Sequence, residues 1–148
     1  MRIYMDVCCL NRPFDDLSQD RIYFEAEAVL SIILRCEKGI WTLMESGVID
    51  YELSNISDEE RLEHVQTLYS TASERITLTK QAENRAKFFQ NNGIKPFDSL
   101  HLALAEACGA DVFITTDDRL LSAAKRLNVQ IKTASPVIWL MEVLGDEN

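Results

Sequence analysis

The sequence predicts an α/β domain in which helices cover both faces of a central, mostly parallel sheet, giving a three-layer α/β/α sandwich. Segments with the spacing of strands alternate with segments of helical spacing along the chain. Short apolar runs such as "VFI" at residues 112–114 fit strands that are covered on both faces. No internal repeat or linker interrupts the alternation, so we expect one domain over residues 1–148.

The N-terminal half is expected to contain two strands and three helices. Residues 2–5 are typical of a short strand, and a polar, proline-containing loop is expected over residues 11–18. Apolar residues recur at helical spacing over residues 20–39, where a glycine ends the pattern. Ser57 and Glu60 have the spacing of a capping box, which satisfies exposed amide groups at a helix start. The remaining expected elements are a strand at residues 40–44 and helices at residues 45–55 and 57–72.

The C-terminal half continues the alternation. Residues 75–79 alternate like a strand, and residues 110–116 form a short apolar strand. The leucines and alanines of residues 95–109 predict a helix that is mostly buried. Ser135 is a suitable cap for the last helix, and Pro136 fits its first position. The remaining expected elements are helices at residues 80–93, 117–128 and 135–144 and a strand at residues 129–133.

The charge balance restricts the classes of function. Twenty-four acidic residues against fifteen basic ones give a formal net charge of −9 and a pI of about 4.7. This argues against a general nucleic-acid binder, which normally carries a basic footprint. A metal-dependent nuclease is still compatible, because it concentrates acids at its centre and needs basic residues only around the rim. A basic protein partner would also be attracted to such a surface.

The sequence also indicates a cytoplasmic protein. It has no apolar run of about eighteen residues that would span a membrane, and its start lacks the long apolar region of a signal peptide. Cys8, Cys9, Cys36 and Cys108 form no CxxC pair. Small buried thiols in a reducing compartment are their expected state.

Acidic residues stand at the positions where a parallel sheet places its ligands. Asp6 follows the first predicted strand, and Asp117 follows the "VFITT" strand. Ligands of open parallel sheets bind outside the carboxyl ends of the strands, so both carboxylates enter one crevice if these strands are neighbours. Asp98 lies near the start of an apolar helix, and Glu52 lies beside an apolar face. Both have the context of acids that look into a polar cleft.

Each acid also has an ordinary structural explanation. Asp98, Asp117 or Asp118 could cap a helix or supply a charge to its first turn, and Glu52 could be a solvated surface acid. We assign Asp118 to the first turn and Asp117 to the site. Four convergent carboxylates without bases would have raised pKa values. Mg²⁺ or Mn²⁺ would resolve this conflict, because these ions favour carboxylate and water oxygens.

The segments "IYMDVCCLNRPFDD", "SGVIDYELSN" and "KPFDSLHLALAEACGADVFITTDDRLL" carry the acids in a fixed order. In that order, and with the alternation of strands and helices, they resemble the PIN domain, the nuclease fold of VapC-type toxins. The likeness extends over nearly the whole chain. Its most specific part joins an Asp-containing helix to a strand that ends in Thr-Thr-Asp.

The resemblance implies metal-dependent hydrolysis of RNA phosphodiester bonds. Matched by motif, Asp6, Glu52, Asp98 and Asp117 correspond to the family's acidic quartet, and Thr116 corresponds to a hydroxyl residue that often supports the site. Mg²⁺ or Mn²⁺ would be the cofactor. The expected partners are an RNA substrate, a cognate antitoxin protein and a second copy of the chain in a homodimer, with no membrane.

Val7 and Cys8 depart from the family pattern, which often has Thr or Ser, and then Asn or Ser, after the first Asp. The loss of these groups removes possible support for the metal ligands. An alternative function is therefore a catalytically weak PIN-like module that binds RNA or a protein partner. A phosphatase of the aspartyl-phosphate type is a third reading, but its usual DxD is absent because position 8 is Cys.

Other residues near these motifs have candidate roles. Asn11, Arg12 and Arg119 are candidate substrate-binding residues, and Arg119 has the best position for a phosphate. His101 shares a helix face with Asp98 but lies among leucines. We therefore expect it in the core or supporting the site. The two tryptophans are expected in the core or in an interface.

Overall fold

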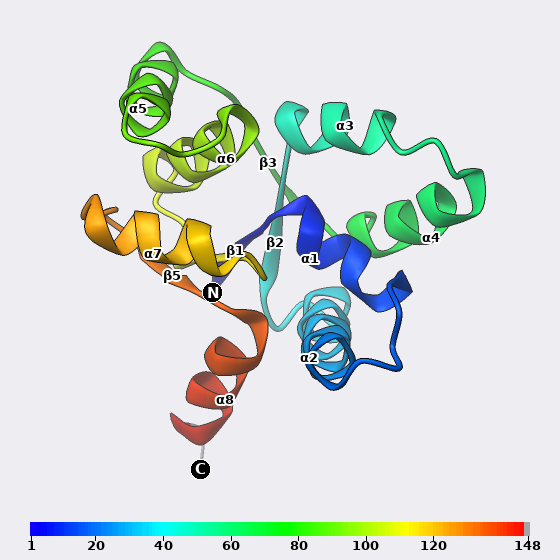
Figure 1. The fold of residues 1–148 in the computed structure, drawn as a ribbon. Coiled ribbons are helices and arrows are strands. Elements are labelled where there is room, and N and C mark those ends of the chain that lie inside the picture. The colour runs from blue at the N-terminus through cyan, green and yellow to red at the C-terminus, as the bar shows by residue number, and fades with distance from the viewer. Residues whose placement is uncertain (147–148) are drawn as a thin grey trace.

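A computed structural model describes residues 1–146, which form one parallel sheet and the helices around it (Figure 1). The strands are β1 (Arg2–Met5), β2 (Thr42–Ser46), β3 (Glu74–Ile76), β4 (Val112–Ile114) and β5 (Lys132–Ala134). The helices are α1 (Val7–Asn11), the 3-10 helix η1 (Arg12–Phe14), α2 (Asp20–Glu37), α3 (Gly47–Ser54), α4 (Glu59–Tyr69), α5 (Lys80–Asn91), α6 (Pro96–Ala107), α7 (Asp118–Arg126) and α8 (Pro136–Asp146).

The sheet has the strand order β3-β2-β1-β4-β5, and every pairing in it is parallel. The first strand is therefore central. In β1, Ile3 faces Leu43 of β2 on one side and Val112 of β4 on the other. All strands end at the same edge because all run in the same direction. The predicted α/β sandwich with a mostly parallel sheet is confirmed.

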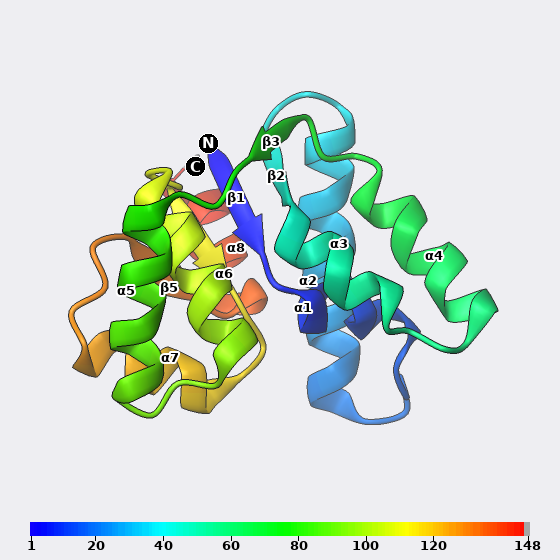
Figure 2. The ribbon, with the colours of Figure 1, turned by 90° about the horizontal axis from the view of Figure 1, so that it is seen from above.

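Helices cover the two faces of the sheet. Viewed from above, α5, α6 and α7 gather on one side of the strands and α1 to α4 on the other (Figure 2). Helix α8 packs against α2. The strands are short and their apolar side chains are almost fully buried, as β4 shows with Val112, Phe113 and Ile114 at 0% exposure. This burial on both faces explains why their sequence is continuously apolar.

The observed helix ends agree with several sequence signals and correct others. Gly39 and Gly93 adopt positive φ angles of 77° and 99° just after α2 and α5, which a side chain would strain. Asp58, and not Ser57, is the N-cap of α4, and it accepts hydrogen bonds from the amides of Glu60 and Arg61. The expected capping box is therefore wrong. A carboxylate one position later satisfies the same amide groups.

The segment after β1 is more helical than the sequence indicates. The expected loop at residues 11–18 contains the end of α1 and the 3-10 helix η1, with Pro13 buried. Asp6 begins α1 by accepting a hydrogen bond from the amide of Cys9 at 3.2 Å. Asp6 follows β1 and is also the N-cap of α1, so it is the sequence signal for this helix.

The tryptophans belong to the core. Trp41 and Trp139 are 5% and 2% exposed and meet edge to face, with ring centroids 4.9 Å apart. Trp139 lies on α8, whereas Trp41 immediately precedes β2. The pair therefore joins the last helix to the second strand. No described helix is both long and apolar enough to cross a membrane.

Replacement of Trp139 by Ala should lower the free energy of unfolding by about 3–5 kcal/mol, because it removes a large aromatic side chain from a packed site. Denaturant unfolding followed by circular dichroism measures this change. Met141 is on the same helix and is 69% exposed, so Met141→Ala should change the value by less than about 0.5 kcal/mol. Equal effects of the two substitutions would contradict the anchoring role of the tryptophan pair.

Candidate active site

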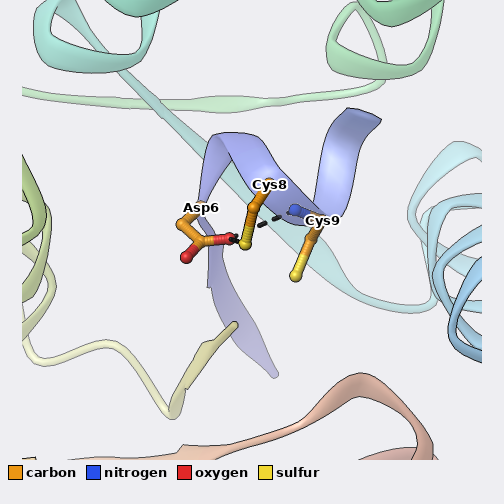
Figure 3. Close-up of side chains that lie close together, drawn as sticks. All are labelled: Asp6, Cys8 and Cys9. Carbon is orange, nitrogen blue, oxygen red and sulfur yellow. Dashed lines mark hydrogen bonds between the residues drawn. The ribbon is translucent and has the colours of Figure 1, made fainter. Parts of the chain in front are cut away.

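The parallel pairing of β1 with β4 brings the two strand-end acids to one edge. Met5 faces Ile114, and the amide of Asp6 donates to the carbonyl oxygen of Ile114 at 3.2 Å. The neighbouring positions expected for these strands are therefore confirmed. Asp6 is only 4% exposed. Its Oδ1 accepts from the amide of Cys9 and from the sulfur of Cys8, 2.7 Å away (Figure 3).

Asp117 has both roles considered for it. It is the N-cap of α7, and its Oδ1 accepts from the amides of Arg119 and Leu120 at 2.9 and 3.2 Å. It also lines a cavity at the carboxyl edge of the sheet. Asp118 lies in the first turn of α7, as expected. Its carboxylate points elsewhere and pairs with Arg21 at 2.8 Å.

The cavity beside Asp6 has a volume of about 250 Å³, and all four predicted acids line it. Asp98 enters it from the first turn of α6, and Glu52 enters it from α3, which packs against α6. Two acids thus come from strand ends and two from helices. The complete lining consists of Asp6, Val7, Cys8, Arg12, Glu52, Asp98, His101, Thr116 and Asp117.

Glu52 is fixed by a buried chain of hydrogen bonds. Its Oε1 is bonded to Nε2 of His101, and Nδ1 of the same imidazole is bonded to the hydroxyl of Tyr4. The Tyr4 hydroxyl lies 3.1 Å from Oγ of Ser46, which accepts from the amide of Ile49. Tyr4 and His101 are 0% and 1% exposed. The expectation that His101 supports the site from the core is consistent with these contacts.

The hydrogen bonds of this chain can all point in one direction. Where Oε1 of Glu52 is the acceptor, Nε2 of His101 is the donor. Nδ1 then accepts from Tyr4, whose oxygen accepts from Ser46. Each buried polar group has a partner in this arrangement, so it costs little to bury. The chain holds the carboxylate of Glu52 in one position at the cavity.

Ionisation of two of the acids, Asp6 and Asp98, is disfavoured by their surroundings. Burial raises the pKa of Asp6 well above its ordinary value, and the contact with Cys8 raises it further. The pKa of Asp98 rises to about 6, first because of burial and then because of the charge of Asp6. A divalent cation would remove both penalties, since it replaces lost hydration and offsets the negative charge. The donor set of carboxylate oxygens fits an ion such as Mg²⁺ or Mn²⁺.

Thr116 lies at the back of the cavity and is 7% exposed. Its hydroxyl accepts from Nη2 of Arg12 at 3.0 Å and donates to the sulfur of Cys8, also at 3.0 Å. Arg12 additionally pairs with Asp15 and with Glu25, at 3.1 and 3.3 Å. Although Arg12 borders the cavity as expected, its guanidinium is therefore engaged with protein groups.

The other candidate substrate residues are placed differently. Asn11 donates to the carbonyl of Val7, and its side-chain oxygen accepts from Arg61. It is not part of the cavity lining. Arg119 lines an adjoining cavity of about 150 Å³ together with Lys95, and this cavity shares Asp98 and Asp117 with the first one. The structure thus separates Asn11 from the acids and brings Arg119 beside them.

Several residues of the site were not found from the sequence. The hydrogen-bonding partners Tyr4 and Ser46 are distant in sequence from Glu52, and only the sheet brings them together. Glu25 is 4% exposed and pairs with both Arg12 and Arg21. A signal for it exists, because Glu25 stands on the apolar face of a predicted helix, where an unpaired acid would be costly.

Comparison with known proteins supports this description. The model of the PIN domain family matches residues 10–126. Among solved structures, the chain is similar to VapBC2 from Rickettsia felis, described as bound to a DNA fragment from its promoter. The TM-score is 0.55 at 13% sequence identity, covering 90% of this chain and 97% of the other. No curated protein matches the sequence.

The chain belongs to the PIN domain family, because the family model covers more than half of its length. PIN domains are generally nucleases, and they generally use divalent metal ions. The matched range includes Glu52, Asp98 and Asp117 but begins after Asp6. The placement of Asp6 with the other three acids therefore comes from the fold itself.

Replacement of Asp98 by Asn should stabilise the metal-free protein at neutral pH. Because its pKa is raised, Asp98 binds its proton more tightly in the folded state than in the unfolded state. The ionisation of Asp98 therefore lowers the free energy of unfolding of the protein as pH rises from about 4 through about 6. Allowing for its partial exposure, the gain should be about 1–2 kcal/mol at pH 7.5.

Urea unfolding in EDTA at several pH values tests this expectation. The difference between Asp98→Asn and the wild type should shrink as pH falls from 6 towards 4. Asp20→Asn, at an exposed position, is the matched control and should show no such trend. A variant less stable than the wild type at pH 7.5 would contradict the electrostatic account.

Proposed function

We propose that this protein is a metal-dependent endoribonuclease that hydrolyses RNA phosphodiester bonds, and that it is the toxin of a cytoplasmic toxin–antitoxin pair. The observation that carries the proposal is the convergence of Asp6, Glu52, Asp98 and Asp117 on one cavity in a PIN domain. Four acids that converge on one cavity, with Asp6 buried and the others partly buried, repel one another unless a cation is present. Hydrolysis at such a site requires no nucleophilic Ser or Cys.

Each acid has a part in holding the metal. Asp6 is the most buried and its position is fixed by the amide of Cys9, whereas Asp117 is fixed by the helix that it caps. Glu52 is fixed by His101. Bound Mg²⁺ or Mn²⁺ would lower the pKa of a water molecule and stabilise charge on the phosphate. The carboxylates would then orient the water and accept its proton.

Basic residues beside the acids offer a route for the RNA backbone. Arg119 and Lys95 border the cavity next to Asp98 and Asp117. Arg119 also lines a further depression together with Arg126, which lies on the same helix, α7. Arginine binds phosphate with several donors at once. An RNA strand that lies along α7 would therefore place successive phosphates beside Arg126, beside Arg119 and at the metal site formed by the acids.

The partners of the proposed toxin follow from charge and from exposed apolar residues. VapBC2 of Rickettsia felis is described as bound to promoter DNA, and for this chain we propose a cognate antitoxin. A net charge of −9 and an acidic cavity favour a basic antitoxin segment that would block the site. Phe24 and Ile138 are 60% and 59% exposed and line one cavity, which supports a homodimer formed through this apolar surface.

A catalytically weak binding module is the alternative function. The observation that favours it is the apolar side chain of Val7 in the cavity lining, together with the engagement of Arg12 by Asp15 and Glu25. Neither residue then helps to bind the scissile phosphate. Binding of metal and RNA without turnover would support this alternative.

Replacement of Asp6 by Asn should reduce RNA cleavage by more than about 100-fold, which exceeds the usual effect of losing a group that only supports a ligand. Asn caps helices as well as Asp does, so α1 should persist. The assay is cleavage of a mixed panel of structured RNAs with Mg²⁺ or Mn²⁺, and with EDTA. Asp20→Asn is the control variant. Unchanged cleavage by a folded Asp6→Asn protein would exclude the proposed chemistry.

Replacement of Arg119 by Ala should lower kcat/KM by roughly tenfold, the size of one charge-assisted contact. It should also make the logarithm of affinity depend less on the logarithm of salt concentration, by about 0.7 in slope. Lys125→Ala is the matched control, because Lys125 lies on the same helix but lines a different cavity. If both variants lose the same activity, only the general charge of α7 matters.

A further inference from the structure

The sulfur of Cys8 stands among the proposed metal ligands. Cys8 is in the first turn of α1, two residues after Asp6, and it lines the same cavity as the four acids. Its Sγ is 2.7 Å from Oδ1 of Asp6 and 3.6 Å from the hydroxyl of Thr115. Figure 3 shows this sulfur against the carboxylate of Asp6. One potential ligand atom that is not oxygen therefore belongs to the site.

The sulfur of Cys8 donates a hydrogen bond to Oδ1 of Asp6 and accepts one from the hydroxyl of Thr116. The guanidinium of Arg12 can only donate, and it donates to the hydroxyl oxygen of Thr116. The hydroxyl proton of Thr116 is then directed at Cys8 Sγ, 3.0 Å away. These contacts hold the sulfur within 4.8 Å of a carboxylate oxygen of Asp6, so one metal ion can contact both atoms.

Cys9 belongs to the same cluster, because its sulfur lies within 4.8 Å of Sγ of Cys8 and of a carboxylate oxygen of Asp6. Cys9 is 0% exposed, its sulfur contacts the carbonyl of Ile114, and it does not line the cavity. Cys36 is buried, and Cys108 lies at the C-cap of α6 beside Arg2. Cys9 and Cys36 fit the expected small buried thiols, whereas Cys108 is only half-buried. Cys8 differs because it has polar contacts on two sides and borders the acids.

We propose that Cys8 is a direct metal ligand beside Asp6, and that it raises the affinity of the site for divalent transition metals such as Co²⁺ and Zn²⁺ relative to its affinity for Mg²⁺. This inference rests on the proposed function, since it concerns the same metal site. Thiolate is a soft ligand that favours such ions, whereas a site of carboxylates alone suits Mg²⁺ or Mn²⁺. Cys8 replaces the polar residue common at this position with a ligand of another class.

The test is a titration of the metal-free protein with Co²⁺, followed by absorption spectroscopy under reducing conditions. A bond between sulfur and Co²⁺ gives a charge-transfer band in the near ultraviolet, whereas binding by oxygen ligands gives only weak visible bands. The wild type should show the charge-transfer band and Cys8→Ser should lose it. Cys9→Ala and Cys108→Ser are the control variants and should keep it.

Competition gives a second readout of selectivity. Excess Mg²⁺ should displace Co²⁺ from Cys8→Ser at concentrations at least about tenfold lower than from the wild type, because even the loss of a group that only supports a ligand lowers metal affinity by about 10- to 100-fold. Circular dichroism of each variant shows whether it is folded. Both measurements are made without RNA, so they do not depend on cleavage.

The outcomes separate this inference from the proposed function. Visible Co²⁺ bands without a charge-transfer band, lost in Asp6→Asn, would overturn the role of Cys8 and leave the carboxylate site intact. A charge-transfer band that disappears in Cys9→Ala but persists in Cys8→Ser would also overturn it. Absence of any Co²⁺ binding by the wild type would remove the metal site and the proposed function with it.

Discussion

The parallel pairing of β1 with β4 is the constraint on which the site depends. The two strands are separated by about a hundred residues in sequence, yet Met5 and Ile114 face each other. Because both strands run in the same direction, the residues that follow them leave the sheet together. Asp6 and Asp117 therefore line the same cavity because the two strands are adjacent and parallel. An antiparallel pairing would place them at opposite edges.

The first turns of α1 and α7 fix the two acids that the strand ends bring together. Asp6 and Asp117 each cap the helix that follows, so one carboxylate oxygen is held by backbone amides. Helix capping and ligand binding are often treated as competing explanations for an acid at a helix start. Here the two are compatible, because a carboxylate has a second oxygen and several lone pairs. The caps position the acids before any ion arrives.

The site is also a source of instability. Burial raises the pKa values of Asp6 and Asp98, and the charges of neighbouring acids raise that of Asp98 further, which means that the ionised forms of both oppose folding at neutral pH. The aromatic pair of Trp41 and Trp139 stabilises the fold instead. Trp41 precedes β2, so it lies away from the carboxyl edge of the sheet where the acids are. Stability and site chemistry are thus divided between different parts of one small sheet, as in many functional proteins.

Most of the fold could be predicted from the sequence, because apolar runs and helix ends such as Gly39 and Gly93 are local signals. The positions of Asp6, Asp98 and Asp117 at one edge could be predicted because strand ends and helix starts have fixed directions in a parallel sheet, whereas Glu52, near the end of α3, was predicted from its place beside an apolar face and from the family resemblance. The contacts of Glu52 could not, since Tyr4 and His101 reach it only through tertiary packing. The helix at residues 7–11 was missed because its cap, Asp6, was interpreted only as a ligand.

The hydrogen-bonded chain from Ser46 through Tyr4 and His101 to Glu52 has a consequence for sequence change in this lineage. Each of its members supplies the partner that the next one needs. Loss of the Tyr4 hydroxyl alone would leave a buried imidazole nitrogen without a donor, at a cost of about 1–3 kcal/mol. These four positions, scattered over two strands and two helices, are therefore expected to be inherited and replaced as a set.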